Sequence, residues 1–117
     1  MTEFLYLYRG GESPTSPAEG QQVMQRWMAW MKELDEKGHL KAVGAPLEKT
    51  GKLVSGKEKI ASDGPFAEAK DLIGGFTLVL AKDIDEAAEL SKGCPIFLAG
   101  GGVEVRPILQ MTMYPKT

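Results

Sequence analysis

This sequence of 117 residues contains a single cysteine, Cys94, and a single histidine, His39. One cysteine excludes an internal disulfide and a thiolate metal cluster, and it suits a reducing cytoplasm. The sequence has no HExxH motif, no paired CxxC and no carboxylate–histidine cluster. We therefore expect no tightly bound metal and no other cofactor.

Basic excess and long apolar runs are also lacking. Lysine and arginine number 14 against 16 acidic residues, for a net charge of −2. Because nucleic-acid binding relies on neutralising phosphates, nucleic acid is not an expected partner. No apolar run approaches the ~20 residues of a membrane span, and residues 1–10 (MTEFLYLYRG) do not form a signal peptide. The sequence predicts a cytoplasmic protein without a membrane partner.

What is present is an ordinary globular composition, with 43% hydrophobic and 26% charged residues. The length predicts a single domain over residues 1–117. A domain of this size has a thin core, so covering an apolar sheet face with a second subunit is favourable.

Strands are predicted where apolar residues alternate or run together between turn signals. Residues 3–8 (EFLYLY) and 74–81 (GGFTLVLA) are apolar on both faces, which indicates central strands. Residues 39–43 form a shorter strand and residues 103–109 a last one. A peripheral polar hairpin is predicted from residues 52–61, with its turn at Ser55-Gly56.

Two helices are predicted. The first is capped by Ser16, with Pro17 in its first turn and Glu19 completing a capping box, and it ends near Lys37 before Gly38. Its apolar stripe, at steps of three and four, comprises Val23, Trp27, Trp30, Met31 and Leu34, with Met24 and Met28 on its flank. The second helix is capped by Asp83 and has a buried stripe of Ile84, Ala87, Ala88 and Leu90. A loop with a short apolar insert follows at residues 94–102.

Without the hairpin, this order of elements is βαββαβ, the ferredoxin-like pattern of the α+β class. It predicts one antiparallel four-stranded sheet with both helices on the same face. The other face still carries apolar side chains, and we expect two copies to pack through it as a homodimer.

Four landmarks in register carry a family resemblance. They are DGPFAE at residues 63–68, Gly74-Gly75-Phe76, Cys94-Pro95 and VEVRP at residues 103–107. The series resembles the DGPF-domain branch of the YCII-related family over roughly residues 4–108. The resemblance implies a ferredoxin-like fold assembled as a dimeric α/β barrel.

The resemblance also bears on activity. Many members pair a histidine of the first helix with an aspartate, and this pairing suggests an enzyme. Asp63 matches the aspartate, whereas Val23 occupies the place of the histidine. Some relatives are fused to, or encoded beside, alternative sigma factors, which implies a regulatory role for those members.

Asp63 is the candidate catalytic residue. Asp63-Gly64-Pro65 is first of all a turn signal, because Asp accepts from backbone amides, Gly permits left-handed angles and Pro restricts φ. The same bend can hold Asp63 at the mouth of a pocket as an acid or base. Arg106 either pairs with a carboxylate such as Asp63 or Glu104, or holds a substrate carboxylate or enolate.

The candidate substrate-binding residues are Arg106, Phe66, Glu68, Tyr6, Trp27, Phe76 and His39. Tyr6, Trp27 and Phe76 are the expected pocket walls, although Trp27 is most simply a packing residue. Phe66 can plug the core instead, Glu68 can be a solvated rim residue and His39 a surface histidine. Cys94 follows a helix C-terminus, which disfavours a nucleophilic thiolate.

Two functions remain open at this level. The first is a cofactor-independent enzyme acting on a small polar organic molecule, with Asp63 as acid or base. The alternative is a non-catalytic module that binds a small ligand or regulates a partner, which the absence of a helix histidine favours.

Overall fold

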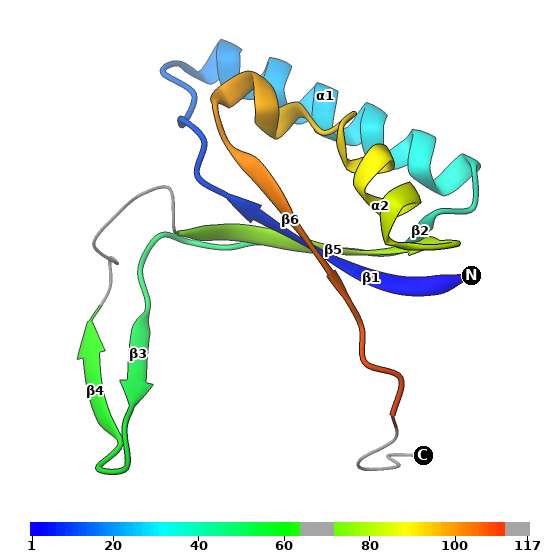
Figure 1. Cartoon of the computed structure of the whole chain (residues 1–117). Coiled ribbons are helices and arrows are strands. Elements are labelled where there is room, and N and C mark those ends of the chain that lie inside the picture. The colour runs from blue at the N-terminus through cyan, green and yellow to red at the C-terminus, as the bar shows by residue number, and fades with distance from the viewer. Residues whose placement is uncertain (64–71, 112–117) are drawn as a thin grey trace.

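Buried and partly buried residues alternate along the central strands, so their side chains point to the two faces of the sheet in turn. Figure 1 shows how the elements are arranged. We analysed a computed structural model, which describes residues 1–63 and 72–111. In chain order its elements are β1 (Thr2–Arg9), α1 (Pro17–Glu36), β2 (Leu40–Pro46), β3 (Lys52–Ser55), β4 (Ile60–Asp63), β5 (Ile73–Ala81), α2 (Ile84–Ser91), the 3-10 helix η2 (Pro95–Ala99) and β6 (Gly102–Pro107).

The four-stranded sheet has the order β2-β5-β1-β6, and all neighbouring strands are antiparallel. Both helices cover the same face of this sheet (Figure 1). With the hairpin set aside, this is the ferredoxin-like arrangement, so the predicted fold class is confirmed. Strands β3 and β4 pair only with each other, as the predicted peripheral hairpin. The two long apolar strands β1 and β5 are central, because each has a neighbour on both sides.

Helix α1 begins and ends as the sequence predicts. The Ser16 side chain accepts a hydrogen bond from the Glu19 backbone N–H at 3.2 Å. The Glu19 carboxylate accepts from the Thr15 hydroxyl at 2.7 Å, so the second half of the predicted capping box involves Thr15. Gly38, with φ of 79°, follows the C-cap Lys37 and turns the chain out of the helix.

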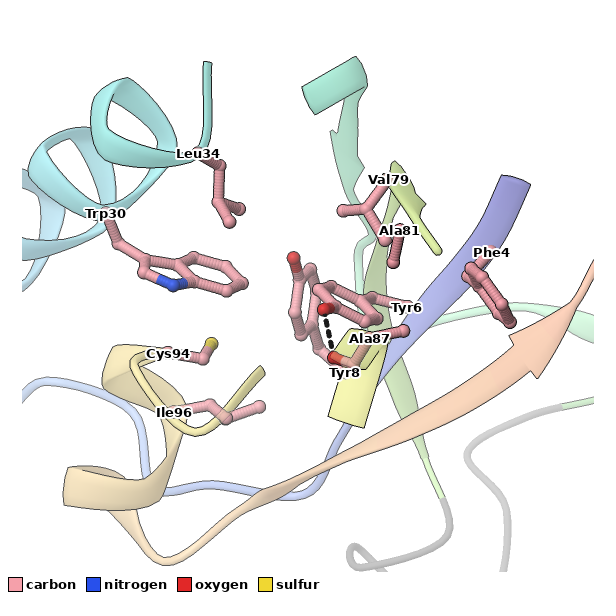
Figure 2. Close-up of a cluster of buried hydrophobic side chains, with 10 residues drawn as sticks. All are labelled: Phe4, Tyr6, Tyr8, Trp30, Leu34, Val79, Ala81, Ala87, Cys94 and Ile96. Carbon is pink, nitrogen blue, oxygen red and sulfur yellow. Dashed lines mark hydrogen bonds between the residues drawn. The ribbon is translucent and has the colours of Figure 1, made fainter. Parts of the chain in front are cut away.

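The core lies between the sheet and the helices and is rich in aromatic rings (Figure 2). Tyr6, which is fully buried, stacks on Trp30 with ring centroids 6.1 Å apart. Trp27 and Tyr8 form a T-shaped pair with a centroid distance of 4.8 Å. The Tyr8 hydroxyl donates to Thr77 Oγ1 at 2.7 Å, so the polar atom under the helices is satisfied. The first helix therefore packs through its predicted stripe.

Several predicted boundaries and burials are corrected by the structure. Strand β2 continues beyond the predicted end, through Gly44 to Pro46. Its pairing with β5 has two register shifts, and Gly44, which lies in the second of them, has a left-handed φ of 76° that glycine adopts readily. Residues 95–99 form a 3-10 helix rather than a loop, and β6 ends at Pro107. Ile84 is 46% exposed, since it is the first residue of a helix of about two turns. Ser91 is buried on α2 in its place.

Candidate functional site

The face of the sheet opposite the helices, here the open face, is apolar at its centre. Residues directly opposite on antiparallel strands point to the same side. Because Tyr6 points to the helices, its neighbours on β1 and their cross-strand partners point away from them. The apolar residues of the open face are Leu5, Leu7, Phe76, Leu78 and Leu80. All five are only partly buried in a single chain.

A charged group, here the arginine cluster, lies at one edge of the open face and consists of Arg9, Glu104 and Arg106. In the sheet, Arg106 is opposite Leu5 and Glu104 is opposite Leu7, which brings both charges to the open face. Arg9 Nη1 lies 2.5 Å from one Glu104 carboxylate oxygen, and Arg106 Nη1 lies 3.2 Å from the other. One carboxylate therefore joins two guanidinium groups.

The charged groups of the cluster differ in how far they are exposed to a ligand. Hydrogen bonds from Arg9 and then from Arg106 hold the pKa of the Glu104 carboxyl below its usual value. The carboxylate is therefore charged at neutral pH, and it accepts hydrogen bonds from both guanidinium groups. The Arg106 side chain is 63% exposed, against 29% for Glu104, so its remaining N–H donors can reach a ligand. Leu5, opposite Arg106, supplies an apolar surface next to it.

A shallow cleft adjoins Arg9 on the side of the turn after β1. Its volume is about 430 Å³, and its walls are residues 9–12 and 99–102, most of which are glycines. The strands approach so closely here that a Cβ on Gly101 would lie 2.7 Å from the Arg9 carbonyl oxygen. Within residues 99–102 (AGGG), Gly101 is therefore required by close packing, whereas Gly100 has a left-handed φ of 80° and no close neighbour.

The predicted pocket walls do not form one wall. Tyr6 and Trp27 lie on the helix-covered side of the sheet, whereas Phe76 and Arg106 share the open face. Burial raises the pKa of Tyr6, whose hydroxyl donates to the Ala87 carbonyl. Tyr6 and Trp27 therefore act in the core, and the half-buried Trp27 is a packing residue as its simplest interpretation predicts.

The other predicted residues are scattered. Asp63 is the last residue of β4; its side chain is 79% exposed and lies 2.7 Å from Lys52 Nζ. The His39 ring Nδ1 lies 2.8 Å from the Leu80 carbonyl oxygen. Phe66 and Glu68 lie outside the described residues. The catalytic role of Asp63 therefore stays a prediction, with a neighbouring lysine as its partner.

Two further observations concern alternative chemistry. Burial raises the pKa of the Cys94 thiol to about 12, so it is protonated at neutral pH, in keeping with its predicted non-nucleophilic character. Among residues 1–63 and 72–111, no group of three His, Cys, Asp or Glu side chains is placed to hold a metal ion.

No helix within the described part of the chain has the length and apolar character needed to cross a membrane.

Sequence reasoning missed Arg9 and left Glu104 as one of two possible partners for Arg106. Its position in the sequence could have indicated Arg9. It follows Leu5 and Leu7 at a spacing of two residues along β1, so its side chain is expected on the same face of the sheet. The register between β1 and β6 decides that Arg9 and Arg106 flank the same carboxylate, and a single sequence does not reveal that register.

The sheet order and the one-sided helix layer define a ferredoxin-like α+β protein. The chain belongs to the YCII-related domain family, whose family model matches residues 4–112.

Individual relatives add detail. An uncharacterized protein of Rhizobium meliloti (strain 1021) is 34% identical over 103 residues, covering 82% of this chain and 81% of the relative. A solved structure of 5-chloro-2-hydroxyhydroquinone dehydrochlorinase from Burkholderia phenoliruptrix AC1100, in complex with 2,5-dihydroxybenzoquinone, is 23% identical. That comparison covers 89% of this chain and 90% of the other, with a TM-score of 0.49.

Proposed function

We propose that this protein binds a small organic anion with an apolar body at the arginine cluster, on an open face that is shared by two copies of the chain. The single observation that carries the proposal is the exposed Arg106 guanidinium beside an apolar sheet surface. A guanidinium group binds a carboxylate or enolate through two parallel hydrogen bonds. Leu5 is opposite Arg106, and the other leucines and Phe76 lie farther across the same face. This apolar surface suits an aliphatic or aromatic body.

The place of the cluster in the sheet supports this proposal. Strand β6 is an edge strand, so Glu104 and Arg106 lie at the rim of the open face. When a second sheet covers the apolar centre, the rim stays accessible from solvent. Covering the centre also removes water from one side of the arginine cluster, which strengthens an ion pair with a bound anion.

The finer family assignment follows from the DGPFAE segment at residues 63–68 together with VEVRP at residues 103–107. These segments support our proposal that the chain falls in the DGPF branch of the YCII-related family. The absence of a histidine at Val23 favours a binding or regulatory module over an enzyme. The exposed Asp63–Lys52 pair points in the same direction, because it puts the carboxylate in bulk solvent in the single chain.

Replacing Arg106 with Gln tests the proposal directly. Benzoate is a suitable probe, since it joins a carboxylate to an apolar ring, and benzyl alcohol serves as its uncharged counterpart. We expect benzoate to shift the amide NMR signals of β1, β5 and β6, and Arg106→Gln to weaken its binding about tenfold or more, the usual effect of losing a charged hydrogen-bond donor.

Two controls make this result specific. Arg26→Gln removes an exposed arginine of α1. Because α1 covers the opposite face of the sheet, this substitution should leave benzoate binding unchanged. Arg106→Lys keeps the charge but loses the planar fork, so its affinity should fall between those of wild type and Arg106→Gln. Equal binding of benzyl alcohol, or equal benzoate binding by Arg106→Gln, would contradict the proposal.

Asp63→Asn separates the binding function from the catalytic alternative. We expect the free energy of unfolding to change by about 1 kcal/mol or less, because exposed ion pairs contribute little. Benzoate affinity should also stay the same, since Asp63 is not part of the arginine cluster. If a substrate is found by thermal-shift screening and Asp63→Asn binds it but turns it over about 10²–10⁴-fold more slowly, Asp63 is an acid or base and the enzyme hypothesis holds.

A further inference from the structure

The β3–β4 hairpin has exposed apolar side chains. Every residue of both strands is exposed, including Leu53 at 49%, Val54 at 61% and Ile60 at 65%. An isolated two-stranded hairpin is at best marginally stable in water. An element with this many uncovered apolar groups therefore gains from a surface that the described part of this chain does not provide.

The apolar residues lie on both faces of the hairpin. Val54 is opposite Ala61, while Leu53 is opposite Ser62 on the other face, which Ile60 shares. A hairpin that is surrounded by solvent has no use for apolar side chains, and a hairpin that packs against one surface needs them on one face only. Two apolar faces are expected of a hairpin that is covered on both sides.

The position of the hairpin shows what can cover it. It leaves the sheet between β2 and β5 and projects beyond the open face, on the side away from both helices (Figure 1). Strand β3 has four residues, about 13 Å of extended chain at ~3.3 Å per residue. Two packed sheets are separated by about 10 Å. The hairpin is therefore long enough to cross the gap to a sheet that faces the open face.

The size of the open face gives a second argument. Four strands spaced at ~4.8 Å, with about six paired residues each, make a footprint of roughly 400 Å². A stable interface usually buries about 800 Å² on each partner. The accessible surface of a face covered by side chains exceeds its flat footprint, so the sheet face alone supplies a substantial part of the area that pairing requires, and an arm from each copy can add to it.

We propose that the β3–β4 hairpin is an arm that packs against a second copy of this chain when two open faces meet. The partner is a second copy because the arm and the uncovered face project to the same side of one molecule, so a two-fold arrangement satisfies both at once. This inference rests on the pairing of open faces proposed above, and it adds the exchanged arm to it.

The test replaces Val54 and Ile60 together with Thr, which keeps the β-branched shape that strands prefer and removes apolar surface. We expect the dimer dissociation constant, measured by sedimentation, to rise about 10- to 100-fold, because two apolar side chains of each arm lose their burial. The control is Leu98→Thr, whose side chain is 76% exposed on the 3-10 helix in the helix layer; its dissociation constant should match that of wild type.

A second measurement uses the wild-type protein, so it does not depend on how the variants fold. Lys57 and Lys59 lie in the hairpin turn, and a lysine-reactive cross-linker applied to a mixture of labelled and unlabelled chains distinguishes links between copies from links within one. We expect links between copies from these two lysines. A dimer whose affinity is unchanged by the Thr pair and whose hairpin links are all internal would overturn the arm while leaving the pairing intact. A wild-type monomer at micromolar concentration would overturn both, whereas benzoate binding at Arg106 is decided by its own titration.

Discussion

Replacing Trp30 with Ala is expected to lower the free energy of unfolding by about 3–5 kcal/mol, the usual cost of deleting a large buried aromatic side chain. Trp30 is 6% exposed and stacks on Tyr6, with its indole also edge-on to Trp27 at 5.9 Å. Gly93 lies against its ring nitrogen, so the backbone of the chain after α2 also packs on this indole. Chemical denaturation measures the effect, and an unchanged m-value shows that only stability has changed.

The matched control is Trp27→Ala, in the same helix and of the same chemistry. Trp27 is half-buried, so its removal leaves a smaller cavity and should cost about 1–3 kcal/mol. The reverse order of the two effects would show that the apolar stripe of α1 faces the sheet at a different angle from the one described.

Gly44→Ala is the second substitution with a large expected effect. Gly44 has φ of 76°, and a Cβ at this position would lie 1.9 Å from the carbonyl oxygen of Phe76. A left-handed backbone costs about 1–2 kcal/mol for a residue with a side chain. The overlap adds to this, because the obstacle is backbone and cannot rotate away. We expect a total loss of about 3 kcal/mol or more, with β2 partly detached from β5.

Gly38→Ala separates these two contributions. Gly38 has φ of 79°, almost the same as Gly44, but nothing lies within 4 Å of the added Cβ. Its substitution should therefore cost only the backbone term of about 1–2 kcal/mol. Thermal or chemical denaturation of both variants gives the comparison. Equal losses for the two glycines would mean that the contact between Gly44 and Phe76 is relieved by a small shift of β2.

Much of the fold could be predicted because its signals are local. The cap at Ser16 and the glycine at Gly38 set the ends of α1, and the spacing of Trp30 and Leu34 set its buried side. The candidate site was less accessible to the same reasoning. Asp63 stood out because Asp-Gly-Pro is a conspicuous turn signal, yet in the structure its carboxylate lies beside Lys52 on an exposed hairpin.

The sequence by itself determined the class of the fold, the order of its strands and α-helices and the apolar character of both faces of the central strands, because caps, turns and side-chain periodicity act within a few residues. Only the tertiary structure decided which charges meet. Arg9 and Glu104 are 95 positions apart and lie within 2.5 Å of each other. Their contact depends on the register between β1 and β6, and a shift by one residue would turn every side chain of β6 to the opposite face.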